Sequence, residues 1–228
     1  MIHPAEATIG GLRNFGRAYL RYRYSILFYS LLFTLMAVPA LNLLRSSGVL
    51  MDALLAANLL VAVMPGRPGR GRRIVLAVMI VVWLARPLAI WSGHRTLSVI
   101  TLGIWTLIGL LAAAAALRYA FRARAIQAEH VYAALSAYLL AGLFFGLLYW
   151  VLEALGSGSF ATPGNFSRMT AIYFSFVTLA TLGYGDIVPR TDIARGLAII
   201  EGVGGQLFLA VLVARLVSMY SGSPKREH

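Results

Sequence analysis

The stretch "TLATLGYGD", residues 178–186, combines hydroxyl side chains, two glycines and an acid between strongly apolar segments. Every residue of this stretch contributes a main-chain carbonyl oxygen, whereas only some of them contribute a polar side chain. The carbonyl oxygens are therefore its most numerous polar groups. Removing a small cation from water costs on the order of tens of kcal/mol unless other oxygens replace its hydration shell. Successive carbonyls that point at one axis replace that shell, so the stretch predicts a site that coordinates a desolvated cation.

Successive carbonyls point at one axis only if the backbone alternates between ordinary and left-handed dihedral angles. Gly183 and Gly185 adopt left-handed angles without steric penalty. Tyr184 between them is expected to turn its ring outward and its carbonyl inward, and Thr181 adds a hydroxyl below the lowest carbonyl. One such strand cannot encircle an ion, so the site needs several copies of the chain around a common axis.

The composition shows what kind of protein holds this stretch. Of 228 residues 60% are hydrophobic and 12% charged, and the mean hydropathy is +0.78, which indicates a membrane protein. The formal net charge is +12, but the arginines cluster between apolar runs instead of following one soluble face, which argues against nucleic-acid binding. We recognise no paired carboxylates, activated nucleophile or phosphate-binding loop, and the chain has no cysteine, so we expect neither an enzyme nor a cofactor.

Six stretches are long enough to cross a hydrocarbon core of about 30 Å as helices. They are predicted over residues 24–43, 48–64, 74–92, 97–117, 131–153 and 193–219. Arginine clusters precede the first stretch, separate the second from the third and follow the fourth, so they share one side if all six cross. The positive-inside rule makes that side cytoplasmic and puts both termini inside; the Arg-rich, Ala-rich composition suggests a bacterial inner membrane.

A seventh apolar segment is too short to cross. "NFSRMTAIYFSFVTLA" follows a loop rich in Gly, Ser and Pro, residues 156–163, which we expect to be flexible. As a helix of roughly 22 Å the segment enters the membrane without leaving it, and either Asn165 or Ser167 is expected to cap its start. A short helix followed by polar backbone predicts a re-entrant loop. Such backbone is tolerated at membrane depth only where protein buries it or where it lines a water-filled path.

The motif and its place between this short helix and a last membrane helix resemble the tetrameric potassium channels, in their six-helix prokaryotic form. The resemblance implies an all-α membrane protein assembled as a homotetramer, with K⁺ as the permeant ion. The residues that it assigns to the selectivity filter and to K⁺ binding through carbonyls and one hydroxyl are Thr181, Leu182, Gly183, Tyr184 and Gly185. Leu182 departs from the valine more often found there, and we expect selectivity to survive that change.

The same resemblance assigns supporting residues behind the filter. Asp186 is expected to stabilise the filter by accepting a hydrogen bond from Tyr173 on the pore helix, and Thr178 belongs to the same support. A modulatory or non-conducting subunit of a heteromeric channel is the alternative function, and the intact motif argues against it.

The last helix contains three glycines and an acid. By resemblance Gly205 lies where the family often bends, and Gly204 and Gly202 are near it; a gating hinge and close helix packing both stay open. Glu201 lies deep in this helix, where an acid suggests function. It either faces a water-filled cavity or accepts hydrogen bonds from the pore helix, and we favour the second.

The fourth predicted helix, residues 97–117, has no arginine at the three-residue spacing of a voltage sensor, so we expect no steep voltage gating. Asp52 and Arg86 lie at comparable depths from the outer membrane surface, and the open alternatives are an ion pair inside the four-helix bundle or separate contacts with the interface.

The predicted organisation has five parts. They are an interfacial cytoplasmic segment whose positive charge favours contact with anionic lipid (1–23), a four-helix domain (24–117), a cytoplasmic linker helix (118–130), the pore domain (131–220) and a short cytoplasmic tail (221–228).

Overall fold

A computed structural model describes residues 22–37, 39–40, 47–63, 70–91, 93, 95–122 and 127–221. Most of the predicted interfacial segment 1–23 and nearly all of the predicted tail lie outside the described residues, so both stay predictions.

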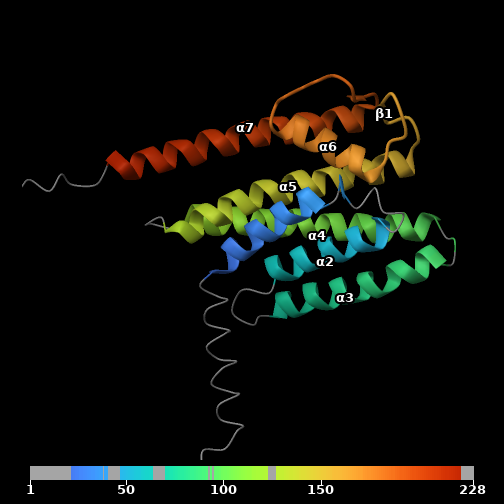
Figure 1. Ribbon diagram of the computed structural model, residues 1–228, viewed down its shortest axis with the longest axis horizontal. Coiled ribbons are helices and arrows are strands. Elements are labelled where there is room, and N and C mark those ends of the chain that lie inside the picture. Colours follow the sequence, from blue (N-terminus) through green and yellow to red (C-terminus); the bar gives the residue numbers. More distant parts are fainter. Residues whose placement is uncertain are drawn as a thin grey trace, which may run out of the picture. The chain divides into compact units, whose positions relative to one another are not determined.

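The described chain is almost entirely helical (Figure 1). A helix covers residues 22–37, and the remaining elements are α2 (Ser47–Val63), α3 (Arg70–Trp91), α4 (Arg95–Arg122), α5 (Ala128–Leu155), β1 (Phe160–Ala161), α6 (Arg168–Leu179), β2 (Val188–Pro189) and α7 (Asp192–Ser221). Long apolar runs without proline explain α4 and α5, whereas α6 ends at Leu179, within the polar motif.

Three of these helices are long and apolar enough to cross a membrane, among the residues that the structure describes. The spans are Thr96–Arg122, Ala128–Leu155 and Asp192–Ser218, with mean hydropathies of 2.2, 2.0 and 2.0. Leu50–Val63 and Arg73–Ala85 are apolar but shorter. The protein is therefore a helical membrane protein, and the number of crossings beyond these three stays a prediction.

The chain divides into two compact units. The first contains residues 1–76 and 116–136, and the second contains residues 77–115 and 137–228. In the first unit the Glu129 carboxylate accepts the backbone N–H groups of Tyr24 and Ser25, at 2.9 and 3.2 Å, and thereby caps the helix over residues 22–37. Asn58 donates to the Thr34 hydroxyl at 2.7 Å in the same unit.

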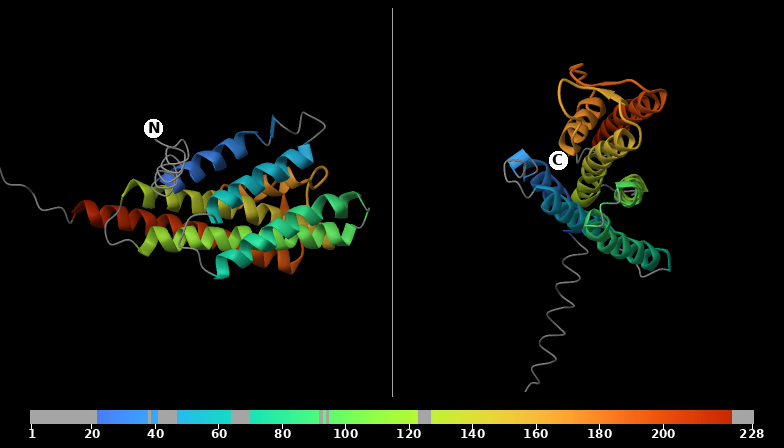
Figure 2. Two further views of the ribbon diagram at one scale, coloured as in Figure 1. Left: turned by 90° about the horizontal axis from the view of Figure 1, so that it is seen from below. Right: turned by 90° about the vertical axis from the view of Figure 1, so that its right-hand side faces the viewer.

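In the second unit α6 lies against α7, as the right view of Figure 2 shows, and it also contacts α5. Its core contains Tyr149 from α5, Phe160 from β1 and Phe174 from α6, with ring centroids 5.0 to 5.4 Å apart. Two glycines one helical turn apart on α5 let α6 approach closely: a Cβ at Gly146 would lie 2.6 Å from the Cα of Ile172, and one at Gly142 would lie 2.6 Å from the Phe176 ring.

The loop that follows α5 contains more regular structure than its composition predicts. β1 pairs antiparallel with β2, and Arg190 donates its N–H to the Ser159 carbonyl at 2.8 Å. The Glu153 carboxylate accepts the N–H groups of Gly158 and Phe160, at 2.8 and 3.1 Å. The expectation of a flexible loop over 156–163 is therefore wrong for β1, because main-chain pairing and an acid at the end of α5 hold it.

Candidate functional site

Helix α6 delivers the polar motif to its position. Ser167 is its N-cap, and the Ser167 hydroxyl accepts the Thr170 N–H at 3.1 Å, which confirms one of the two predicted caps. The helix has 12 residues, about 18 Å, so it cannot cross a membrane. After it the chain turns back, with the Leu182 N–H donating to the Val177 carbonyl at 2.8 Å.

The backbone of the motif alternates in handedness. Thr181, Gly183 and Gly185 have φ angles of +55°, +59° and +78°, whereas Leu182 and Tyr184 between them are not in the positive-φ region. The left-handed angles expected for the two glycines are thus present. Alternation of this kind turns successive carbonyl oxygens toward one side, where they can replace the water around a cation.

Thr181 was predicted as a filter residue, but its left-handed φ angle was not predicted from the sequence. A left-handed conformation is uncommon for a β-branched residue and costs on the order of 1–3 kcal/mol. Two hydrogen bonds hold it: its N–H donates to the Thr178 carbonyl at 3.0 Å, and its hydroxyl accepts Nε2 of Gln206 from α7 at 2.9 Å. The sequence signal for this contact was Gln206, an amide side chain in a mostly apolar helix, directly after Gly205.

Aromatic and acidic side chains lie beside the motif. The Tyr184 ring stacks on the Tyr173 ring, with centroids 6.4 Å apart and planes 9° apart. The Tyr173 side chain interacts with Asp186, and Asp186 Oδ1 accepts the Ile187 N–H at 3.1 Å. The two side chains are thus brought together, whereas the predicted hydrogen bond between them and its effect on function stay predictions.

Glu201 faces α6, the orientation that the sequence analysis favoured. Its side chain is 2% exposed, Tyr149 on α5 donates to Oε2 at 2.6 Å, and the Ser175 hydroxyl on α6 contacts Oε1. The partners Tyr149 and Ser175 were not predicted, since hydroxyl residues are common in membrane helices and their spacing from Glu201 carries no local pattern.

The three glycines of α7 differ in their surroundings. A Cβ at Gly205 would lie 2.4 Å from the Leu179 carbonyl oxygen, whereas one at Gly202 would meet the Thr178 carbonyl at an ordinary 3.7 Å. A Cβ at Gly204 would meet nothing within 4 Å in the described chain. Gly205 is therefore required for the close approach of α7 to the end of α6.

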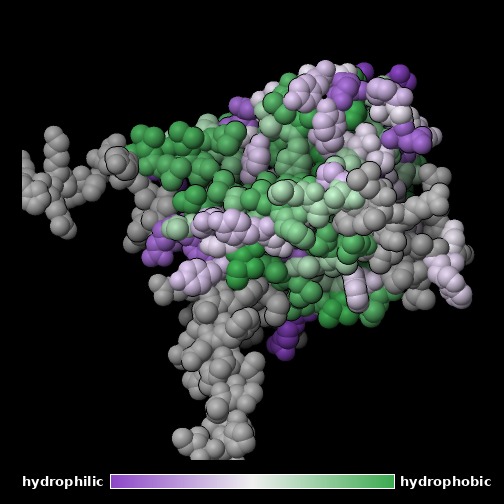
Figure 3. All heavy atoms as spheres, viewed as in Figure 1, coloured by the Kyte–Doolittle hydropathy of each residue, from purple (hydrophilic) through white to green (hydrophobic). Residues whose placement is uncertain are grey.

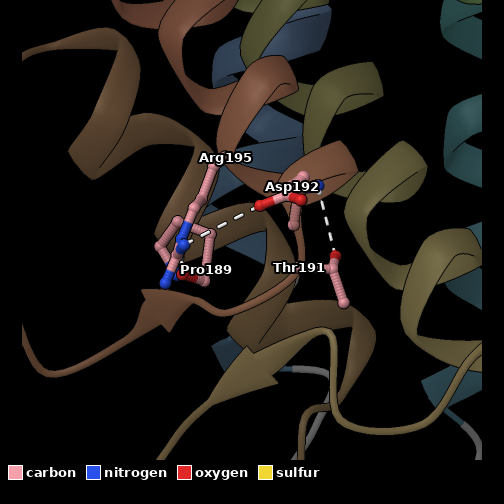
Figure 4. Close-up of polar contacts among 5 residues, drawn as sticks. Pro189, Thr191, Asp192 and Arg195 are labelled. Carbon is pink, nitrogen blue, oxygen red and sulfur yellow. Dashed lines mark hydrogen bonds and ion pairs between the residues drawn. The ribbon is translucent and has the colours of Figure 1, made fainter.

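The segment after the motif is tied to the start of α7 (Figure 4). Nε of Arg195 donates to the Pro189 carbonyl at 3.3 Å, and the same side chain lies 3.8 Å from the Asp192 carboxylate. Thr191 accepts the Ala194 N–H at 3.3 Å and caps the helix. The exposed ion pair contributes little by itself, so the main-chain contact fixes the position of β2.

The predicted pair of Asp52 and Arg86 is not decided by the structure. Asp52 lies in α2, and the side chain of Arg86 lies outside the described residues, so the pair stays a prediction.

A short helix and an alternating loop between two membrane-crossing helices define the pore domain of an ion channel. The family described as "Ion channel" matches residues 134–221, from α5 to the end of α7. No solved structure matches the chain significantly.

Several relatives are named as potassium channels. The chain is 50% identical over 48 residues to "Two-pore potassium channel 4" of Arabidopsis thaliana, covering 21% of this chain and 17% of that protein. It is 41% identical over 51 residues to "Probable potassium channel protein 2" of Methanocaldococcus jannaschii, covering 21% and 15%. It is 33% identical over 84 residues to "Inward rectifier potassium channel Kirbac3.1" of Paramagnetospirillum magnetotacticum, covering 37% and 27%.

The matched stretches thus span well under two thirds of these relatives' lengths. Through residues 134–221 this transmembrane chain matches the ion channel family, and the three relatives described above, to which it is similar, are named as potassium channels.

Proposed function

We propose that four copies of this chain form a passive, potassium-selective channel whose filter is residues 181–185. The observation that carries the proposal is the alternation of left-handed and ordinary φ angles over these five residues. Stacked rings of carbonyl oxygens and the Thr181 hydroxyl would replace the hydration shell of K⁺, and neighbouring ions would repel one another onward.

Surface exposure supports assembly with further copies of the chain. Only 11% of the apolar stretch of α7 is buried within the chain, against 56% for α4 and for α5. Figure 3 shows apolar side chains along the exposed part of α7. Leu182 and Tyr184 in the filter are also 56% and 66% exposed. Lipid and neighbouring subunits would cover these surfaces, and a fourfold ring would close the filter.

The remaining features of the proposed channel concern its topology and gating. Six helices cross the bacterial inner membrane, with both termini cytoplasmic and anionic lipid at that face. Opening is not steeply voltage-dependent, because α4 carries no arginine between Arg95 and Arg118.

Flux through the purified protein in liposomes tests the proposal. We expect a K⁺ gradient to drive flux without any partner protein, and Na⁺ to permeate poorly. A homotetramer that carries no K⁺ flux under any pH, voltage or lipid would support the alternative, a subunit that modulates other channels. A trimeric assembly, or equal permeation of Na⁺ and K⁺, would contradict the filter itself.

Tyr173→Phe is expected to shorten the open state. Tyr173 interacts with Asp186 beside the alternating backbone. A hydrogen bond between them would hold that conformation, so removing the hydroxyl group would favour departure from it. A hydrogen bond to a charged group contributes about 1.5–3 kcal/mol, which corresponds to roughly tenfold or more in lifetime. Single-channel recording of Tyr173→Phe, Asp186→Asn and the double variant measures this; fully additive effects would show that the two side chains do not act together.

Gln206→Met is expected to lower the preference for K⁺ over Na⁺. Met has a similar length but no donor, so the Thr181 hydroxyl would lose the bond that fixes its orientation. Loss of about 1 kcal/mol corresponds to roughly fivefold in selectivity. The reversal potential with K⁺ on one side and Na⁺ on the other measures it, and Leu207→Met at the next position is the control. An unchanged reversal potential would mean that this bond has no part in selectivity.

A further inference from the structure

A buried polar cluster joins three helices behind the filter. The Glu201 carboxyl of α7 contacts the Tyr149 hydroxyl of α5 at 2.6 Å and the Ser175 hydroxyl of α6. The Ser175 hydroxyl also lies 2.7 Å from the Gly142 carbonyl of α5. Tyr149, Ser175 and Glu201 are all at most 2% exposed, so water does not supply partners.

The contacts of this cluster need one more hydrogen than the hydroxyl groups possess. There are three oxygen-to-oxygen contacts, and each requires a hydrogen. Tyr149 and Ser175 supply one hydrogen each, and the Gly142 carbonyl can only accept. If Ser175 donates to Gly142, its contact with Glu201 must be made by a hydrogen on the carboxyl group. A carboxylate would leave two acceptor oxygens competing for the single Ser175 hydrogen.

We infer that Glu201 is a neutral carboxylic acid that positions the pore helix. Its Oε1–H donates to Ser175, Ser175 donates to the Gly142 carbonyl, and Tyr149 donates to Oε2. This chain of donors connects α7 to α6 and α6 to α5, at a point one turn before the end of the helix that delivers the filter.

The surroundings of Glu201 contain nothing that would favour its ionised form. The titratable side chains that face it are Tyr149 and Tyr138, both on α5, and the polar contact from α6 is Ser175. Among the described residues no arginine or lysine pairs with it. An unpaired charge in such a place is expensive, whereas a neutral acid with every donor and acceptor satisfied is not.

Ionisation would therefore loosen the pore helix. When the acid loses its proton to water, the Ser175 hydrogen can serve either Gly142 or Glu201 and one contact between helices is lost. The inference predicts a channel that is stable at neutral pH and weakens under alkaline conditions. The substitution Glu201→Gln would remove this dependence, since the new amide donates to Ser175 and accepts from Tyr149 at any pH.

Infrared spectroscopy of the full-length protein in lipid tests the inference without requiring conduction. The difference between the wild type and Glu201→Gln is expected to contain the carbonyl band of a protonated acid, which disappears as the pH is raised. Glu153→Gln is the matched control: the Glu153 carboxylate accepts only backbone N–H groups, so its difference spectrum is expected to contain carboxylate bands alone. Carboxylate bands in both differences would overturn the inference.

Two further measurements keep the test decisive if Glu201→Gln assembles poorly. In the wild type, the acid band should shift on exchange into heavy water and vanish at alkaline pH. In Ser175→Ala it should remain but move toward the frequency of a less strongly bonded acid. K⁺ flux should fall at alkaline pH in the wild type and hold in Glu201→Gln. Absence of flux in every variant, with the acid band present, would count against the proposed channel but not against the neutral acid.

Discussion

Gly183→Ala is expected to abolish potassium-selective flux. Gly183 has a φ of +59°, and a Cβ there would meet nothing within 4 Å, so the restriction is the dihedral angle and not the space. A left-handed angle costs an L-residue with a side chain roughly 1–2 kcal/mol. Four copies in one ring multiply this to about 4–8 kcal/mol, which corresponds to at least a roughly thousandfold loss of the conducting conformation.

Gly164→Ala provides the control for Gly183→Ala. It also lies in a loop of the pore domain with no atom within 4 Å of the added Cβ, but its φ is not in the positive region. We expect normal tetramers and normal K⁺ flux from Gly164→Ala, and assembled tetramers without selective flux from Gly183→Ala. If Gly183→Ala kept its K⁺ preference in a liposome flux assay, the alternating backbone would not be the basis of selectivity.

The parts of the pore domain that could be predicted have local causes. A serine just before a short apolar helical segment predicts a cap, and a glycine in a stretch whose carbonyls must point at one axis predicts a left-handed angle. Ser167 and Gly183 behave accordingly. The contact between Tyr173 and Asp186 was predicted from a resemblance, because nothing in the local sequence pairs residues 13 positions apart across a turn.

The parts that could not be predicted depend on tertiary contacts. The left-handed angle of Thr181 opposes its intrinsic preference and is held by Gln206, 25 residues away. The pairing of β1 with β2 joins two-residue strands that are too short for any periodicity. The number of membrane crossings depends on the lengths of the helices. α2 has 17 residues and its apolar part is shorter still, so its crossing does not follow from length and hydropathy alone.

One face of α7 gathers the contacts that fix the filter from below. Glu201 contacts Ser175, Gly205 allows α7 to approach Leu179, and Gln206 donates to Thr181. Positions 201 and 205 are one helical turn apart and 206 is adjacent, so a single rotation or displacement of α7 would alter all three contacts together. A movement of the last helix would therefore reach the filter through packing and hydrogen bonds within one subunit.

Gly205→Ala separates close packing from hinge bending in α7. The added methyl group would lie 2.4 Å from the Leu179 carbonyl oxygen, a backbone atom that cannot rotate away. Overpacking costs typically about 1–3 kcal/mol, here in every subunit, so we expect a clear loss of tetramer stability on heating. Gly204→Ala, which meets nothing within 4 Å, should keep or raise stability, since alanine favours the helix by about 1 kcal/mol.

The comparison of these neighbouring substitutions is decisive because the two proposals for Gly205 predict different observables. Close packing predicts that Gly205→Ala lowers the thermal stability of the detergent-solubilised tetramer, and that Gly204→Ala does not. A pure hinge predicts that both tetramers are equally stable, and that Gly205→Ala alters only the fraction of time the channel is open. Since the Leu179 carbonyl belongs to the last residue of the helix that leads into the filter, we expect the packing result together with impaired K⁺ selectivity.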